Sequence, residues 1–296
     1  MRVTFGSSFR NALIDVNRAA EQFAQRQREV SSGKRLHAAS ENPSAMSTVV
    51  LERTEMQQLD QYLRAADSVE SRLMVADAVF TDLVKQLTAA QARGVGGRST
   101  VLTQPQRNAL AGDLRGIRDA LLAAVNTSYR DVQIFSGTAS QTPPYAPGPP
   151  ISAYQGNADV AYVDVGRQRS AQVTFDASSF LGGTPSGDIF QVLDDLAMAV
   201  QTGDMGTIDA RLQAVGQVFQ QVTQAQSGVG TDLAALVDDR ARLGEMRRAS
   251  DKRRSALEDT NLAESLSGQT QADAAHRAGL SALAAASRLS LLDYLK

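Results

Sequence analysis

The chain has 296 residues, of which 43% are hydrophobic, and its formal net charge is −2. A charge this close to zero excludes a global electrostatic field that would draw nucleic acid or an anionic membrane to the whole surface. The absence of cysteine excludes disulfides and thiolate catalysis, and no apolar run approaches the ~20 residues needed to span a membrane.

The first predicted element is a helix over residues 8–32. Its apolar positions alternate steps of four and three, which is a heptad seam, and Gly33 is placed to end the helix in a left-handed conformation. Charges interrupt residues 1–30, so we expect no cleaved secretory signal; a chain that leaves the cell would use another route.

A polar connector leads into a long predicted helix over residues 44–93. Asn42 can cap this helix, with Pro43 at its first position. The spacing of three and four predicts one apolar stripe, whose expected core members include Leu63, Leu73, Phe80 and Leu87. Glycines at 94, 96 and 97 are predicted to end the helix.

Further along, Thr103 with Gln106 predicts a capping box at the start of a third helix. Residues 131–187 then hold most of the prolines, and period-two alternation predicts strands at 161–165 and 171–175. About 55 residues are few for an independent core, so we expect this β-rich insert to lean on the helices.

The chain then returns through helices. A short helix is predicted from Asp188 to Gly203, followed by a second long seam that runs to Leu243. The expected core members of that seam are Leu212, Val215, Phe219 and Val222. Gly228 and Gly230 argue against one unbroken helix. A basic cluster at 247–254 is interpreted as a solvated helix face in preference to a nucleic-acid patch, because acidic residues flank it.

The sequence therefore predicts a mainly α fold with a small β-rich insert, in which N- and C-terminal segments form a long antiparallel bundle and the β domain lies at its tip. We divide it into 1–42 (terminal helix and connector), 43–130 (first half of the rod), 131–187 (insert), 188–256 (second half of the rod) and 257–296 (terminal helix).

Each terminal helix has an apolar stripe that lacks a partner in this plan. We expect neighbouring subunits to cover these stripes, and head-to-tail repetition of such a surface gives a ring or an open helical polymer. The predicted assembly residues are Phe9, Leu13, Val16, Phe23, Val30, Leu262, Leu266, Leu280, Leu283, Leu289, Leu292 and Leu295.

Motifs at both ends resemble the bacterial flagellin family. The first runs Val30-Ser31-Ser32-Gly33-Lys34-Arg35-Leu36 and continues at Ala39-Ser40-Glu41-Asn42-Pro43; the family usually has paired aspartates where this chain has Glu41-Asn42. Residues 257–264 and 289–295 resemble the C-terminal region of the family. Residues 227–231 resemble its glycine-containing turn into the last long helix.

Three middle motifs are closest to the branch of the family that lies between hook and filament. They are Ile134-Phe135-Ser136-Gly137-Thr138, Thr142-Pro143-Pro144-Tyr145 and Tyr154-Gln155-Gly156-Asn157. The resemblance implies a structural subunit that forms a ring-like homo-oligomeric layer outside the cell. It also implies type III export without a cleaved signal. The implied partners are hook-associated protein 1, flagellin and a flagellar export chaperone.

No catalytic, cofactor or metal site is predicted. His37 and His276 have no partner at metal-ligand spacing and are expected at the surface. Asp194-Asp195 and Asp238-Asp239 are sequence neighbours on helices and do not face each other.

Two other interpretations remain open. One is a minor flagellin, which would build long filaments. The other is an intracellular coiled-coil scaffold, which would need neither the insert nor export.

Overall fold

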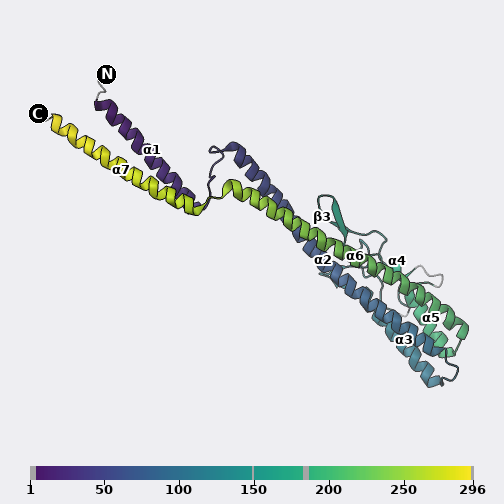
Figure 1. Ribbon diagram of the computed structural model, residues 1–296. Helices are drawn as coiled ribbons and strands as arrows, with labels where there is room; N and C mark the ends of the chain where they lie inside the picture. Colours follow the sequence, from purple (N-terminus) through teal and green to yellow (C-terminus); the bar gives the residue numbers. More distant parts are fainter. Residues whose placement is uncertain (1–4, 149, 183–186, 295–296) are drawn as a thin grey trace. The chain divides into compact units, whose positions relative to one another are not determined.

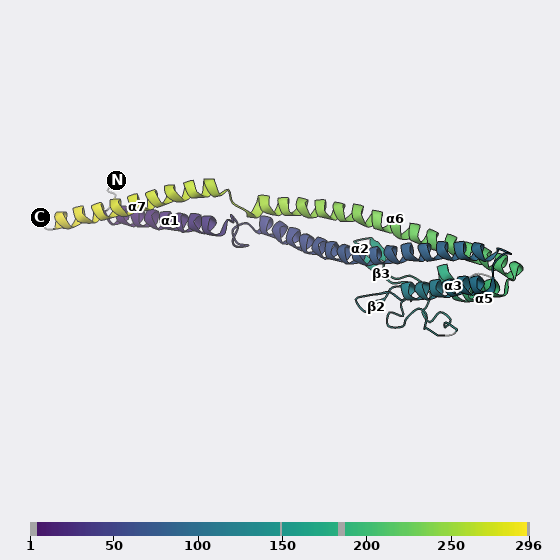
Figure 2. The same cartoon turned by 90° about the horizontal axis from the view of Figure 1, so that it is seen from below.

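The computed structural model describes residues 5–148, 150–182 and 187–294, with side chains described between residues 9 and 285. Contacts divide the chain into two units: Met1–Gln58 with Met246–Lys296, and Leu59–Glu245. Figures 1 and 2 show long helices with a small amount of β-structure, which confirms the predicted fold class.

The helices are α1 (Phe5–Ser32), α2 (Pro43–Gly97), α3 (Gln104–Val125), α4 (Ser178–Leu181), α5 (Ile189–Thr202), α6 (Met205–Glu258) and α7 (Leu262–Tyr294). The strands are β1 (Ser128–Tyr129), β2 (Val132–Gln133), β3 (Tyr162–Gly166) and β4 (Arg169–Gln172), which form two antiparallel hairpins. Across the described helices, none is long and apolar enough to cross a membrane.

In the second unit, α2 and α6 pair in opposite directions (Figure 2). Two positions of the α6 seam, Gln226 and Arg240, are polar, and both bond to α2. Gln226 Nε2 donates to Thr81 Oγ1 at 3.0 Å, and Arg240 pairs with Asp67 and Glu70 at 2.8 and 2.9 Å. These contacts explain how the seam tolerates two polar positions.

The predicted rod core lies in this unit. Leu73, Phe80, Leu87, Val215 and Val222 have no exposed surface. Leu212 and Phe219 are half-buried and pack against the same hydrophobic core, and Leu63 is half-buried.

Two predictions about glycine need correction. The helix α2 ends at Gly97, the last of the three predicted glycines, but it runs through Gly94 and Gly96. The helix α6 continues through residues 227–231 without the expected turn. Close packing explains two of the α2 glycines. A Cβ on Gly94 would lie 2.6 Å from Leu212 Cδ2, and one on Gly97 would lie 2.5 Å from Val200 Cγ2.

Glycines in α2 and α3 offer a matched test of this packing. Gly97→Ala should destabilise the protein by about 1–3 kcal/mol, because the buried, β-branched Val200 cannot move aside. Gly112→Ala meets no atom within 4 Å and should stabilise α3 by about 0.5–1 kcal/mol. Chemical denaturation of both variants checks the signs, and a shift of the same sign in both would contradict the packing account.

The insert packs on α2, as expected. The Phe80 ring contacts Phe135, Phe175 and Phe180 at centroid distances of 5.6, 5.9 and 5.0 Å. The β3 strand lies one residue from its predicted position, but β4 ends at Gln172, whereas the prediction continued to residue 175. Beyond Gln172 the chain stays extended and bonds elsewhere, with Phe175 N donating to Ile134 O at 2.8 Å.

Candidate assembly surface at the paired termini

The helices α1 and α7 lie side by side within the first unit (Figure 1). Their direction is antiparallel, because Gly268 faces Arg26 while Gly279 faces Val16. Between these contacts, the Phe23 and His276 rings stack with centroids 6.4 Å apart. The prediction of a surface position for His276 is therefore wrong, since its ring is half-buried between the helices. We call α1 and α7 together the terminal pair.

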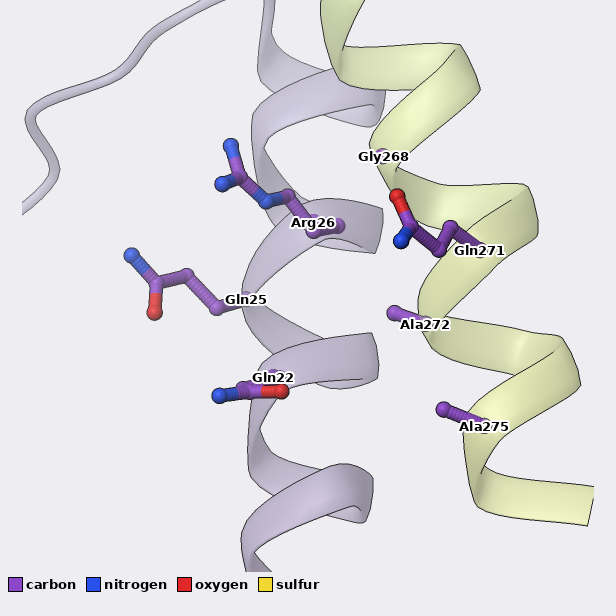
Figure 3. Close-up of a pocket in the computed structure, with 7 residues that line it drawn as sticks. All are labelled: Gln22, Gln25, Arg26, Gly268, Gln271, Ala272 and Ala275. Carbon is purple, nitrogen blue, oxygen red and sulfur yellow. The ribbon is translucent and has the colours of Figure 1, made fainter. Parts of the chain in front are cut away.

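The side of α7 that faces α1 is built from small residues. Gly268, Ala272 and Gly279 recur at steps of four and seven, and a Cβ on Gly279 would lie 3.1 Å from Val16 Cγ2. Figure 3 shows Ala272 and Ala275 pointing toward α1, beside a shallow groove of about 380 Å³. Small side chains let two helices approach closely, so this face serves the contact within the molecule.

Three of the described leucines of α7 therefore keep much of their surface outside the contact with α1. The side chains of Leu262, Leu266 and Leu280 are 57%, 54% and 46% exposed; we call these three the outer leucines. On α1, Leu13 and Ile14 are 38% and 55% exposed. Ile14 was not among the predicted residues, because it lies one position off the heptad seam.

The other predicted assembly residues are less available to a neighbour. Val16 is buried in the terminal pair, which corrects its assignment to an uncovered stripe. Phe9, Phe23, Val30 and Leu283 are half-buried. The side chains of Leu289 and Leu292, and the whole of Leu295, lie outside the described residues.

The flagellin-like motif after α1 forms the connector to α2. Gly33 ends α1 with φ = 68°, as predicted, and its N–H donates to Glu29 O at 2.9 Å. Asn42 Oδ1 accepts from Ala45 N at 3.1 Å, which confirms the predicted cap with Pro43 at the first helical position. His37 is exposed, and its ring nitrogen lies 2.7 Å from Ser32 Oγ.

This connector is hydrogen-bonded to the one between α6 and α7. Arg35 N donates to Glu258 O at 2.7 Å, and Thr260 N donates to Gly33 O at 3.0 Å. Between them, Lys34 and Asp259 form a β-bridge. The two turns that carry the chain into and out of the terminal pair are thus held together by their backbones.

The side chain of Glu258 lies at the centre of this contact and is 3% exposed. Its carboxylate pairs with Lys34 Nζ at 2.5 Å, with Arg254 Nη1 at 3.0 Å and with the Arg53 guanidinium. Burial alone would raise its pKa, but the hydrogen bonds from Lys34 and Arg254 and the charge of Arg53 outweigh burial and lower the pKa below its ordinary value. Sequence reasoning missed this role, although Glu258 lies within a motif that carried the resemblance.

The predicted middle motifs meet one another in the second unit. Thr138 N donates to Asn157 Oδ1 at 2.8 Å, and Tyr154 Oη donates to Phe135 O at 3.2 Å. Gly137 has φ = 66°, and a Cβ there would lie 2.2 Å from Asn157 O. The motif residues Phe135, Gly137 and Thr138 therefore contribute to the packing and hydrogen bonding of the insert.

The paired acids lie in separate ion pairs. Asp194 pairs with Arg118, Asp195 pairs with Arg211 at 2.9 Å, and Asp239 pairs with Arg169 at 2.5 Å. Within the described part of the chain, no group of three or more His, Asp or Glu side chains could hold a metal ion. Within the basic cluster, Arg253 donates to both carboxylate oxygens of Glu52, at 2.6 and 3.0 Å, as expected for a solvated helix face.

Comparisons with known proteins place this geometry in context. Residues 8–140 match the family described as the bacterial flagellin N-terminal helical region. The chain is 24% identical over 280 residues to flagellar hook-associated protein 3 of Escherichia coli, covering 85% of this chain and 87% of that protein. It is 23% identical over 259 residues to the protein of the same name from Salmonella typhimurium, covering 80% and 81%.

Solved structures share the fold. FlgL from Xanthomonas campestris superposes with a TM-score of 0.62 at 12% identity, covering 68% of this chain and 98% of that one. Flagellar hook-associated protein 3 from Legionella pneumophila has a TM-score of 0.62 at 11% identity, covering 69% and 97%.

Proposed function

We propose that this chain is a flagellin-like, hook-associated structural protein of the bacterial flagellum and not an enzyme. In this proposal it is the subunit that joins the hook to the filament. The observation that carries the proposal is the exposure of the outer leucines. Leu262, Leu266 and Leu280 are about half exposed although α1 lies beside α7. Full burial of an exposed leucine contributes about 1.5–3 kcal/mol, so a neighbouring subunit that covered the remaining surface would gain about half of that for each side chain.

The contact between copies is expected to be head-to-tail. In such a contact, an apolar face of one copy meets a different face of the next copy. Repeating this contact builds an array of subunits that closes into a ring or continues as a helix. A junction needs a short, ring-like layer, with hook-associated protein 1 on one side and flagellin on the other. The names of the curated relatives support the hook side of this proposal.

We further propose that the chain works outside the cell and travels through the flagellar export apparatus. The outer leucines would be an aggregation hazard at high concentration in the cytoplasm. An export chaperone that covers α7 before secretion would remove this hazard.

A minor flagellin is the second candidate function. The match of residues 8–140 to a flagellin description favours it, because bulk filament subunits share that region. An intracellular coiled-coil scaffold has less support, since it would not need the insert that packs on Phe80.

Deletion of the gene separates these functions. For a junction subunit, we expect cells with intact hooks and no filaments, with flagellin shed into the medium. Electron microscopy and immunoblotting of the medium are the measurements. Filaments of normal length in the deletion strain would contradict the junction role.

A further inference from the structure

The contact between the two connectors has the construction of a latch. Its backbone part is short: two hydrogen bonds, from Arg35 N to Glu258 O and from Thr260 N to Gly33 O, flank the bridge of Lys34 with Asp259. A ladder this small is weak alone, because its two hydrogen bonds must offset the backbone entropy lost by every residue that they order. Side chains must therefore supply most of the stability of the contact between the two connectors.

Those side chains converge on one carboxylate. Glu258 accepts from Lys34 on the first connector, Arg53 on α2 and Arg254 on α6, so it joins three separate segments. Arg35 adds hydrogen bonds from its guanidinium to the carbonyls of Ala256 and Leu257 at 3.3 and 3.1 Å.

The cations that pair with Glu258 differ in whether they have another anionic partner. Arg254 also pairs with Asp251 at 2.9 Å and with Asp259 at 3.5 Å, so it keeps partners when Glu258 loses its charge. Lys34 and Arg53 have Glu258 as their ion-pair partner among the described residues. Neutralising this single carboxylate therefore leaves two nearby cations uncompensated.

We propose that Glu258 is a latch that locks the terminal pair onto the adjoining ends of α2 and α6, and that removing its negative charge opens both connectors together while the helices stay folded. The open state keeps the terminal pair joined by two connectors without their mutual hydrogen bonds. This device is independent of the proposed place in the flagellum, because it concerns the isolated chain.

The latch should weaken in acid. The pKa of Glu258 is lower in the folded state than its ordinary value of 4.5. Its carboxylate therefore stabilises the folded state fully above pH 4.5, and this stabilisation is lost as the pH falls through the folded-state pKa. Opening should therefore begin below about pH 4.5. The charged groups that face Glu258 are Lys34, Arg53 and Arg254, and Arg254 also pairs with Asp251 and Asp259.

Limited trypsin digestion of the full-length chain tests the latch, because Lys34 and Arg35 are themselves cleavage sites. Glu258→Gln should release fragments 1–34 and 1–35 about tenfold faster than wild type, since the change removes the negative charge that Lys34, Arg53 and Arg254 share. Glu52→Gln is the matched control, because Glu52 pairs with Arg253 in the same unit and does not touch either connector. Its cleavage rate should stay within about twofold.

Arg53→Gln and hydrogen exchange complete the test. Should Glu258→Gln unfold the chain, Arg53→Gln removes one cation with a half-exposed side chain and should still speed cleavage after Lys34 and Arg35. In wild type, the amides of Arg35 and Thr260 should lose protection together below about pH 4.5. Cleavage at the wild-type rate in both variants, or independent exchange of the two amides, would overturn the latch.

Discussion

Leu73→Asp should unfold the second unit at temperatures where the wild type is stable. Leu73 has no exposed surface and lies in the seam between α2 and α6. Losing the leucine side chain costs about 2–5 kcal/mol, and a buried, unpaired carboxylate adds several more. The sum approaches the whole stability of a typical domain, about 5–15 kcal/mol. Thermal melting followed by circular dichroism is the measurement.

Met74 provides the control at the next position of the same helix. Its side chain is 55% exposed, so Met74→Asp changes the same helix by the same charge without entering the core. We expect a shift within about 0.5 kcal/mol for this exposed substitution. An unchanged melting temperature for Leu73→Asp would mean that the seam does not stabilise the monomer.

Replacing the outer leucines Leu262 and Leu266 by serine should abolish incorporation into the flagellum without lowering the stability of the monomer. Both side chains are more than half exposed in the isolated chain, so the monomer loses little buried surface. Because about half of each side chain remains to be buried, an assembled neighbour would lose about 1.5–3 kcal/mol of contact for the two residues together, which is a change of about ten- to a hundredfold in affinity. Co-sedimentation with isolated hooks carrying their associated proteins is the measurement.

Met198→Ser is the matched control for this variant. Met198 lies on α5 in the second unit and is 61% exposed, so the change removes an exposed apolar side chain of similar size away from the terminal pair. Sedimentation should be unaffected. Equal binding of the leucine variant and the wild type would exclude the outer leucines from the assembly surface.

Helical periodicity made much of the fold predictable. In a long helix every third or fourth residue faces the same partner, so local spacing alone identified Leu73, Phe80, Val215 and Val222 as core. Capping chemistry is equally local. It identified Asn42 and also Thr103, whose N–H donates to Gln106 Oε1 at 2.9 Å.

Contacts between distant segments set the limit of that prediction. Gly94 was predicted as a helix breaker, because its packing role depends on Leu212, which is more than a hundred residues away in the sequence. The turn between β1 and β2 was missed as well. Arg130 and Asp131 adopt the left-handed conformation there, with φ = 51° and 63°. The turn lacks the glycine or asparagine that usually indicates this conformation in a sequence.

The candidate site shows the same limit on α7. The leucine pattern correctly indicated an apolar face, but it did not indicate which face of α7 meets α1. Close packing of two helices requires small residues such as Gly268 and Ala272. A search for hydrophobic residues does not identify such positions as part of an interface. The burial of Val16 and the exposure of Leu262 follow from that choice.

Electron microscopy of the purified full-length protein, added to isolated hooks that carry their associated proteins, tests the central claim most directly. We expect wild type to add one short layer at the hook end and the variant with Leu262→Ser and Leu266→Ser to leave the ends bare. A wild-type chain that leaves hook ends bare, or that grows into long filaments without flagellin, would contradict the proposed junction.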